Sequence, residues 1–114
     1  MRIDTIKVTS QEIENTLWQA GVRREPITVT LYDRAKGKTT ALINFAKEFC
    51  FNVIVPFDYM RESLVHEHGY QNIYTVAELK MSTVPYRPIV FDEGVDYQTL
   101  EESKYEVVTG FIRE

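Results

Sequence analysis

Hydrophobic positions along the chain follow two patterns, short β-branched runs and longer segments with apolar residues at helical spacing. The short runs predict strands at 27–32, 53–55, 73–75, 89–91 and 105–108, with a further strand or ordered arm at 3–8. The helical spacing predicts a helix that stops at Gly21, helices after 38 and 58, a turn at 77–79 and a last helix at 96–100. Strands and helices that alternate in this way are typical of βαβ units with right-handed crossovers. The pattern therefore predicts an α/β fold, a mostly parallel five-stranded sheet flanked by helices in three layers.

Length and composition favour a single domain over 1–114. A chain of 114 residues, 44% of them apolar and 26% charged, is long enough to form one core without disulfides or structural metal ions. We expect an N-terminal arm and helix at 1–25 and the core of the domain at 26–114. No apolar run approaches the ~20 residues that span a bilayer, and the start lacks the apolar stretch of a signal peptide. We therefore expect a cytoplasmic protein with no membrane partner.

The net charge argues against strong autonomous binding to nucleic acid. It is −4 at pH 7, whereas nucleic-acid binding draws on a basic face that displaces counterions. Arg34, Lys36 and Lys38 form a local basic patch, which keeps a nucleic-acid contact open as an alternative. Phosphate binding by the same loop explains these three side chains equally well.

Several side chains that could carry chemistry are better explained as core residues. Cys50 is the only cysteine and lies between Phe49 and Phe51, so we expect a buried small hydrophobic residue rather than a nucleophile. The rings of Phe57 and Tyr59 could stack on nucleobases, but packing against the sheet is the stronger expectation.

The segment after the strand at 27–32 carries the residues of a phosphate-binding loop. Gly37-Lys38-Thr39-Thr40 lies between that strand and an apolar helix, close to the pattern G-x-x-x-x-G-K-[ST]. Gly37 lets the backbone approach a phosphate, and the helix that begins near Lys38 offers unpaired N–H groups and the positive end of its dipole. Lys38 would neutralise the β and γ phosphates, while the Thr39 hydroxyl would bind Mg²⁺. The predicted nucleotide-binding residues are Gly37, Lys38, Thr39, Thr40, Lys36 and Arg34.

The loop departs from the standard pattern at two positions. Tyr32 stands where the first glycine of the pattern makes a sharp turn, and Asp33 adds a negative charge close to the phosphates. Arg34 and Lys36 offset that charge. The alternative interpretation is an unrelated α/β domain in which Lys38 only occupies the start of a helix.

A second motif, Ile89-Val90-Phe91-Asp92-Glu93, ends a predicted buried strand with two acidic residues. Because parallel sheets bind ligands beyond the carboxyl ends of their strands, we expect this pair and the loop at one edge. Asp92 would hold magnesium through water, and Glu93 would orient or deprotonate the attacking water. Alone, the pair would favour a strand that turns into a loop; together with Lys38 and Thr39 it favours a site. We predict Glu93 as the catalytic residue, and Thr39 and Asp92 as the Mg²⁺ ligands.

The order of these motifs resembles the first RecA-like domain of superfamily one and two helicases and of small phage P-loop ATPases, with a degenerate Walker A. Gly37-Lys38-Thr39-Thr40 is similar to the end of Walker A, Val53-Ile54-Val55-Pro56 to motif Ia, and Ile89-Val90-Phe91-Asp92-Glu93 to Walker B. The last strand, ending Val108-Thr109-Gly110, stands where the sensor motif would be. The resemblance covers roughly residues 27 to 110. It implies a P-loop NTPase-like fold that takes ATP with Mg²⁺.

The resemblance also limits the activity that we expect. We expect no second RecA-like domain to supply an arginine, and Arg87 and Arg113, near a strand start and the chain end, are not assigned to transition-state chemistry. We therefore predict weak or partner-dependent ATP hydrolysis, with a protein partner that supplies the missing groups. One alternative is a catalytically inactive P-loop-fold module for binding or assembly. A second is a thymidine-kinase-like nucleoside kinase, in which Glu93 would activate the substrate hydroxyl.

Overall fold

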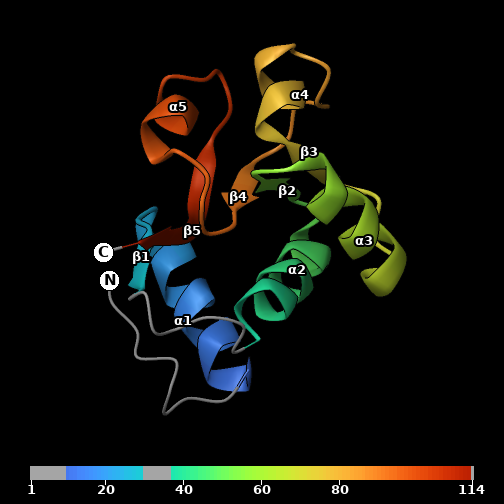
Figure 1. Cartoon of the computed structure of the whole chain (residues 1–114). Helices are drawn as coiled ribbons and strands as arrows, with labels where there is room; N and C mark the ends of the chain where they lie inside the picture. The colour runs from blue at the N-terminus through green and yellow to red at the C-terminus, as the bar shows by residue number, and fades with distance from the viewer. Residues whose placement is uncertain (1–9, 30–36, 114) are drawn as a thin grey trace.

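The computed structural model describes residues 10–29 and 37–113, which fold around one five-stranded sheet (Figure 1). Its strands are β1 (Ile27–Val29), β2 (Asn52–Val55), β3 (Ile73–Thr75), β4 (Ile89–Phe91) and β5 (Val107–Arg113). They lie in the order β1-β5-β4-β2-β3, and each neighbouring pair is parallel. The predicted α/β fold with a five-stranded sheet is therefore confirmed, and the described sheet is parallel throughout. The predicted strand or arm at 3–8 and the end of the strand predicted at 27–32 lie outside the described residues.

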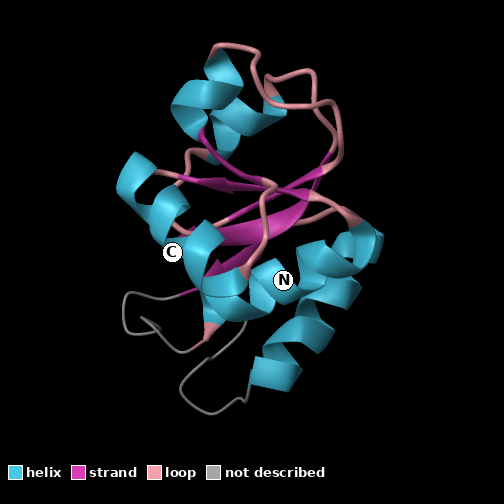
Figure 2. Cartoon of the chain, turned by 90° about the vertical axis from the view of Figure 1, so that its right-hand side faces the viewer, coloured by secondary structure: helices cyan, strands magenta, loops and turns pink. Residues whose placement is uncertain are grey.

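Helices cover both faces of the sheet and give the three predicted layers. They are α1 (Ser10–Arg23), α2 (Lys38–Phe49), α3 (Asp58–His68), α4 (Val76–Lys80) and α5 (Tyr97–Glu101). Helices α1, α2 and α3 lie on one face, and α4 and α5 lie on the other (Figures 1 and 2). The chain runs outward from β1 to β2 and β3, then returns through β4 to β5. Right-handed crossovers in these two directions place their helices on opposite faces of the sheet.

Strand β4 and residues 53–55 of β2 form continuous apolar runs because both faces of these central strands are buried. Val53 and Val55 of β2 pack in the same cluster as Leu17 of α1, whereas Ile54 packs with Leu100 of α5. Each of these side chains is fully buried. Apolar burial contributes roughly 25 cal/mol per Å² of surface removed from water, so these two clusters are the main stabilising feature of the fold.

Helix α1 has 14 residues and continues past Gly21, where the sequence pattern had predicted its end. A Cβ at Gly21 would lie 3.2 Å from side-chain atoms of both Phe45 and Val108. The glycine therefore allows close packing of α1 against α2 and β5 rather than ending the helix. Within residues 10–29 and 37–113, no helix is long and apolar enough to cross a bilayer.

Strand β5 differs most from its prediction. The sequence predicted a strand at 105–108, whereas the structure has Val107–Arg113. The first part of β5 pairs with β4, up to Gly110 opposite Phe91, and the last part pairs with β1, up to Arg113 opposite Val29. Because β1 and β4 are staggered along the sheet, the strand between them needs this length to pair with both.

The carboxyl ends of β1, β5 and β4 meet at one edge of the sheet, and this edge positions the candidate site. Helix α2 begins at Lys38 after β1, Asp92 and Glu93 follow β4, and β5 ends at Arg113. Ligands of parallel α/β sheets bind beyond this kind of edge.

Candidate functional site

The start of α2 has the geometry of an anion-binding site. Gly37 precedes the helix in the left-handed conformation, with φ 81° and ψ 11°, which glycine adopts without strain. Its carbonyl accepts a hydrogen bond from Ala41 N at 2.9 Å, and Gly37 itself provides no side-chain cap. The first-turn N–H groups and the positive end of the dipole of this 12-residue helix therefore point toward the sheet edge.

Asp92 is buried at the end of β4. Its N–H donates to the Ile54 carbonyl at 2.9 Å, which extends the β4–β2 pairing by one residue. Its carboxylate accepts two hydrogen bonds, at Oδ1 from Glu93 N–H at 2.8 Å and at Oδ2 from the Thr39 hydroxyl at 2.9 Å. Burial raises the pKa of Asp92, because the charged form loses its hydration, and the two hydrogen bonds offset this effect only in part.

Glu93 connects the end of β4 to the start of α2. Its Oε2 lies 3.0 Å from the Lys38 ammonium, and the two side chains are only 12% and 5% exposed. Its Oε1 accepts a hydrogen bond from Arg113 Nε at 2.8 Å. Burial alone would raise the pKa of Glu93, but the hydrogen bonds and charges of Arg113 and Lys38 outweigh burial and lower it. The ionised carboxylate is thus held between two cations.

The structure places four of the predicted site residues in direct contact with one another. Lys38 contacts Glu93 and Thr39 contacts Asp92, across sequence separations of 55 and 53 residues. Gly37 lies directly before the two loop residues. The predicted convergence of the loop and the acidic pair at one sheet edge therefore describes the observed geometry.

Of the remaining predicted ligands, the structure describes only Thr40. Thr40 is exposed, and with Gly37, Lys38 and Thr39 it lines a hollow of about 240 Å³ between the start of α2 and α3. Arg34 and Lys36 lie outside the described residues, as do Tyr32 and Asp33, the two departures from the loop pattern.

The oxygen atoms of the cluster suit Mg²⁺. Magnesium prefers oxygen ligands, keeps several waters and is usually held by one or two carboxylates together with substrate phosphates. The Thr39 hydroxyl and the Asp92 carboxylate offer oxygen atoms of this kind, with Oγ1 and Oδ2 2.9 Å apart. In the described part of the chain, no group of three or more His, Cys, Asp or Glu side chains could hold a metal ion. The residues therefore fit a magnesium ion that arrives with a nucleotide better than a metal held by protein ligands alone.

Arg113 contacts the cluster through Glu93, a contact that the sequence analysis does not predict. From the sequence it is assigned no role in transition-state chemistry, because it lies near the chain end. Strand β5 instead carries Arg113 to the carboxyl edge, where it contacts Glu93. Phe111 and Ile112 extend the apolar run after Gly110, and this extension was the available sequence signal.

The segment that stands where a sensor motif would be, Val108-Thr109-Gly110, comes before the end of β5 that contacts the cluster. Thr109 is buried, and its hydroxyl donates to the Glu25 carbonyl at 2.8 Å, near the start of β1. Gly110 lies against Phe91 of β4. The residue of β5 that contacts the cluster is therefore Arg113, whereas the Thr109 hydroxyl is bonded near the start of β1.

Three side chains that were expected in the core are exposed. Cys50 occupies the left-handed C-cap of α2, with φ 58°, where the chain turns at the surface. Phe57 and Tyr59 are 53% and 70% exposed and stack on each other, with ring centroids 5.5 Å apart. The two rings follow the carboxyl end of β2, which neighbours β4, the strand that leads to Asp92 and Glu93.

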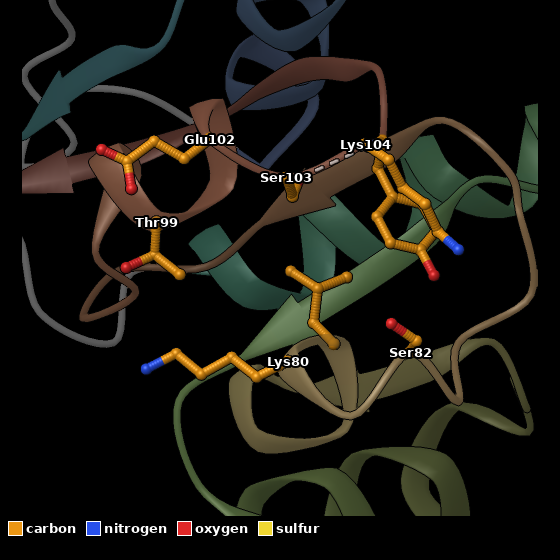
Figure 3. A pocket seen from close by; sticks show the side chains of 8 residues that line it. Lys80, Ser82, Thr99, Glu102, Ser103 and Lys104 are labelled. Atoms are coloured by element: carbon orange, nitrogen blue, oxygen red, sulfur yellow. Dashed lines mark hydrogen bonds between the residues drawn. The ribbon is translucent and has the colours of Figure 1, made fainter.

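A separate hollow of about 280 Å³ lies between α4 and the residues around the end of α5 (Figure 3). None of the predicted site residues lines it. Thr99 and Glu102, which line it, already hydrogen-bond to Asp96 and Gln98. Because its lysines, Lys80 and Lys104, are exposed, the hollow lacks the buried ionic contacts seen at the start of α2. The stronger candidate site is therefore the cluster at the carboxyl edge.

No protein-family model matches this chain, and neither a curated protein nor a solved structure matches it. Function on a common fold such as this one has to be argued from the site. Here the relevant site is the contact between Lys38-Thr39 and Asp92-Glu93.

Proposed function

We propose that this protein binds ATP with Mg²⁺ and hydrolyses it weakly or only with a partner. The observation that supports the proposal best is the double contact between the start of α2 and the end of β4. Lys38 lies 3.0 Å from Glu93, and Thr39 lies 2.9 Å from Asp92. A lysine, a hydroxyl and two carboxylates that meet at a helix N-terminus meet the chemical needs of a magnesium–polyphosphate ligand.

Each residue of the cluster has a role in this proposal. Lys38, the Gly37 backbone and the first-turn N–H groups of α2 hold the β and γ phosphates. Magnesium, when bound, neutralises charge on the phosphates, and Thr39 and Asp92 are its protein ligands. Glu93 orients the water that attacks the terminal phosphorus and accepts its proton, as the bond to the leaving ADP breaks.

Slow turnover of the isolated chain is part of the proposal. Glu93 is a weak base in this arrangement, because Lys38 and Arg113 both stabilise its ionised form. Lys38 also has to give up its contact with the Glu93 carboxylate before it can bind a phosphate of the nucleotide. A protein partner that opens these contacts or adds a cation would raise the rate, and an added arginine alone is worth about 10³–10⁵ in known cases.

The fold supports this proposal at a general level. A parallel sheet with a loop-to-helix start and an acidic strand end at one edge is compatible with a minimal RecA-like domain of the helicase and phage ATPase type. We extend the proposal to that relationship, and with it to a cytoplasmic role in phage or nucleic-acid metabolism. The double contact at the carboxyl edge supports nucleotide binding independently of that relationship.

Calorimetric titration tests nucleotide binding directly. ATP and a non-hydrolysable analogue are titrated into the protein with and without Mg²⁺, and the expected result is binding that requires the metal. Lys38→Ala should abolish this binding, because it removes the cation at the phosphates. Lys47→Ala is the matched control, since Lys47 lies on the same helix but is exposed and contacts only the His68 carbonyl among the described residues.

The outcomes separate the proposal from its competitors. Magnesium-dependent binding in the native protein and in Lys47→Ala, but not in Lys38→Ala, supports a working site. Equal binding in all three proteins would place the nucleotide elsewhere. No binding at millimolar nucleotide would contradict the proposal and direct attention to protein-binding surfaces.

A binding or assembly module is the second candidate function, and a specific surface favours it. At the end of α2 distant from Lys38, Trp18 and Phe49 are 44% and 40% exposed, with ring centroids 4.8 Å apart. Together with Phe45, Phe51 and Val22 they line an apolar hollow of about 280 Å³. Exposed apolar clusters of this kind often mark protein-binding sites. In that case Lys38→Ala would leave partner binding unchanged, whereas Phe49→Ala would weaken it.

A further inference from the structure

Arg113 ends β5 at the carboxyl edge of the sheet, next to the contact between Lys38 and Glu93. Strand β5 runs between β1, which leads into the phosphate loop, and β4, which leads into the acidic pair. Arg113 pairs in register with Val29, and its side chain is 48% exposed. It therefore reaches the site from the strand that separates its two halves.

The Glu93 carboxylate shows how the cations of the site are arranged around an anion. Its Oε2 lies 3.0 Å from Lys38 Nζ, and its Oε1 lies 2.8 Å from Arg113 Nε. One anionic group thus bridges a lysine at the start of α2 and an arginine at the end of β5. A terminal phosphate, which has three negatively charged oxygens, could be bound by the same two cations.

We propose that Arg113 is a phosphate-contacting arginine supplied by the chain itself, which moves from Glu93 to the terminal phosphate when ATP binds. This inference rests on the proposed function and deepens it. The move changes only hydrogen bonds: Arg113 gives up Glu93 Oε1 and donates to phosphate oxygens, while Glu93 becomes available to water. The chain would then provide one of the cations that the sequence interpretation assigned entirely to a partner.

The inference predicts that Arg113 distinguishes ATP from ADP. An arginine on the terminal phosphate strengthens binding of a triphosphate and leaves a diphosphate unaffected. A purely structural ion pair between Arg113 and Glu93 would not change this preference. The ratio of the two affinities is therefore the informative readout.

The test measures the affinities of Mg²⁺–ADP and of a magnesium-bound, non-hydrolysable ATP analogue for the native protein and three variants. Arg113→Ala should bind the analogue about tenfold more weakly and ADP within about twofold of the native protein. Arg113→Lys should restore part of the loss, because it keeps the charge without the planar guanidinium. Arg24→Ala is the matched control, since Arg24 Nε lies 3.1 Å from Glu106 and its side chain is 49% exposed.

Circular dichroism of each variant establishes that it is folded. An unchanged ATP-to-ADP ratio in folded Arg113→Ala, or an equal loss in Arg24→Ala, would overturn the role of Arg113 while leaving nucleotide binding intact. Absence of any nucleotide binding by the native protein would instead overturn the proposed function and this inference with it. Single-turnover hydrolysis of bound ATP gives a second readout, and it should slow by at least tenfold in Arg113→Ala.

Discussion

The ammonium of Lys38 and the carboxylate of Glu93 lie 3.0 Å apart in an almost buried ion pair. Both groups lose most of their hydration there, and their mutual attraction offsets part of that loss. The ion pair connects the first turn of α2, which holds Lys38, to the segment after β4, which holds Glu93. A phosphate that binds Lys38 has to compete with Glu93, so this contact opposes ligand binding.

Glu93→Gln should tighten the binding of Mg²⁺–ATP and abolish its hydrolysis. The neutral amide competes less well for Lys38, and we expect a gain of about tenfold in affinity, the equivalent of roughly 1.4 kcal/mol. Hydrolysis should fall because the amide cannot accept the proton of the attacking water. Calorimetry and a phosphate-release assay measure the two effects. Glu102→Gln, on an exposed position after α5, should change neither, and weaker binding by Glu93→Gln would contradict the competition between Glu93 and phosphate.

Asp92→Asn should separate the stability of the fold from magnesium binding. The amide can keep both contacts, with its oxygen accepting from Glu93 N–H and its nitrogen donating to Thr39 Oγ1, and the variant removes a charge that is only 3% exposed. We expect equal or greater stability in urea, by up to about 1 kcal/mol, together with loss of the magnesium dependence of nucleotide binding. Thr39→Val should instead lower stability by about 1–3 kcal/mol, since it deprives the buried carboxylate of a hydrogen bond. A marked destabilisation by Asp92→Asn would show that the carboxylate is needed for folding.

The two acidic residues should give opposite pH dependences of stability. The pKa of Asp92 is raised above its usual 3.8, so the folded state binds that proton more tightly, and its contribution to stability falls as the pH rises from 3.8 through the folded pKa. The pKa of Glu93 is lowered below its usual 4.5, so its contribution is present above pH 4.5 and is lost as the pH falls through the folded pKa. The free energy of unfolding, measured with urea at several acidic pH values, should therefore fall less steeply with rising pH in Asp92→Asn than in the native protein. Glu93→Gln should lose less stability than the native protein as the pH falls. Identical slopes of unfolding free energy against pH in the native protein and both variants would contradict the two pKa shifts.

The predictable part of the fold depends on features that are local in the sequence. The β-branched runs around Val53-Ile54-Val55 and Ile89-Val90-Phe91 read as buried strands because helices cover both of their faces. The loop at Gly37 and the acids after Phe91 could be placed at one edge, because parallel strands end on the same side. Direct contact of Lys38 with Glu93 follows from that placement together with the length of the lysine side chain.

The unpredicted part depends on packing between distant segments. The length of β5 is set by the stagger of β1 against β4, and the residues near Val107 in the sequence carry no information about that stagger. The position of Arg113 beside Glu93 depends on this length. A glycine at position 21 is typical of a helix end, but in the structure its missing side chain lets Phe45 pack closely against α1. Cys50 has a hydrophobic environment in the sequence, but the left-handed turn after α2 places it at the surface.

Gly110→Ala should disrupt both the sheet and the candidate site. A Cβ at Gly110 would lie 2.3 Å from Phe91 Cδ1 and 2.4 Å from the Phe91 carbonyl oxygen, distances that the neighbouring backbone cannot accept without moving. We expect a loss of at least about 3 kcal/mol in the free energy of unfolding, measured by urea denaturation, because β4 and β5 have to separate. Their separation would also move Arg113 away from Glu93 and reduce any binding of nucleotide.

Gly69→Ala is the control for the general effect of replacing a glycine. Gly69 ends α3 with φ 61°, and a Cβ there would meet nothing within 4 Å, so only backbone strain of about 1–2 kcal/mol is expected. A similar loss of stability in the two variants would show that close contact with Phe91 is not what requires glycine at position 110. A much larger loss in Gly110→Ala, with α3 intact in Gly69→Ala, would show that the spacing of β4 and β5 depends on the missing side chain. That spacing determines how near Arg113 can come to Glu93, and so it connects the packing of the sheet to the arrangement of the site.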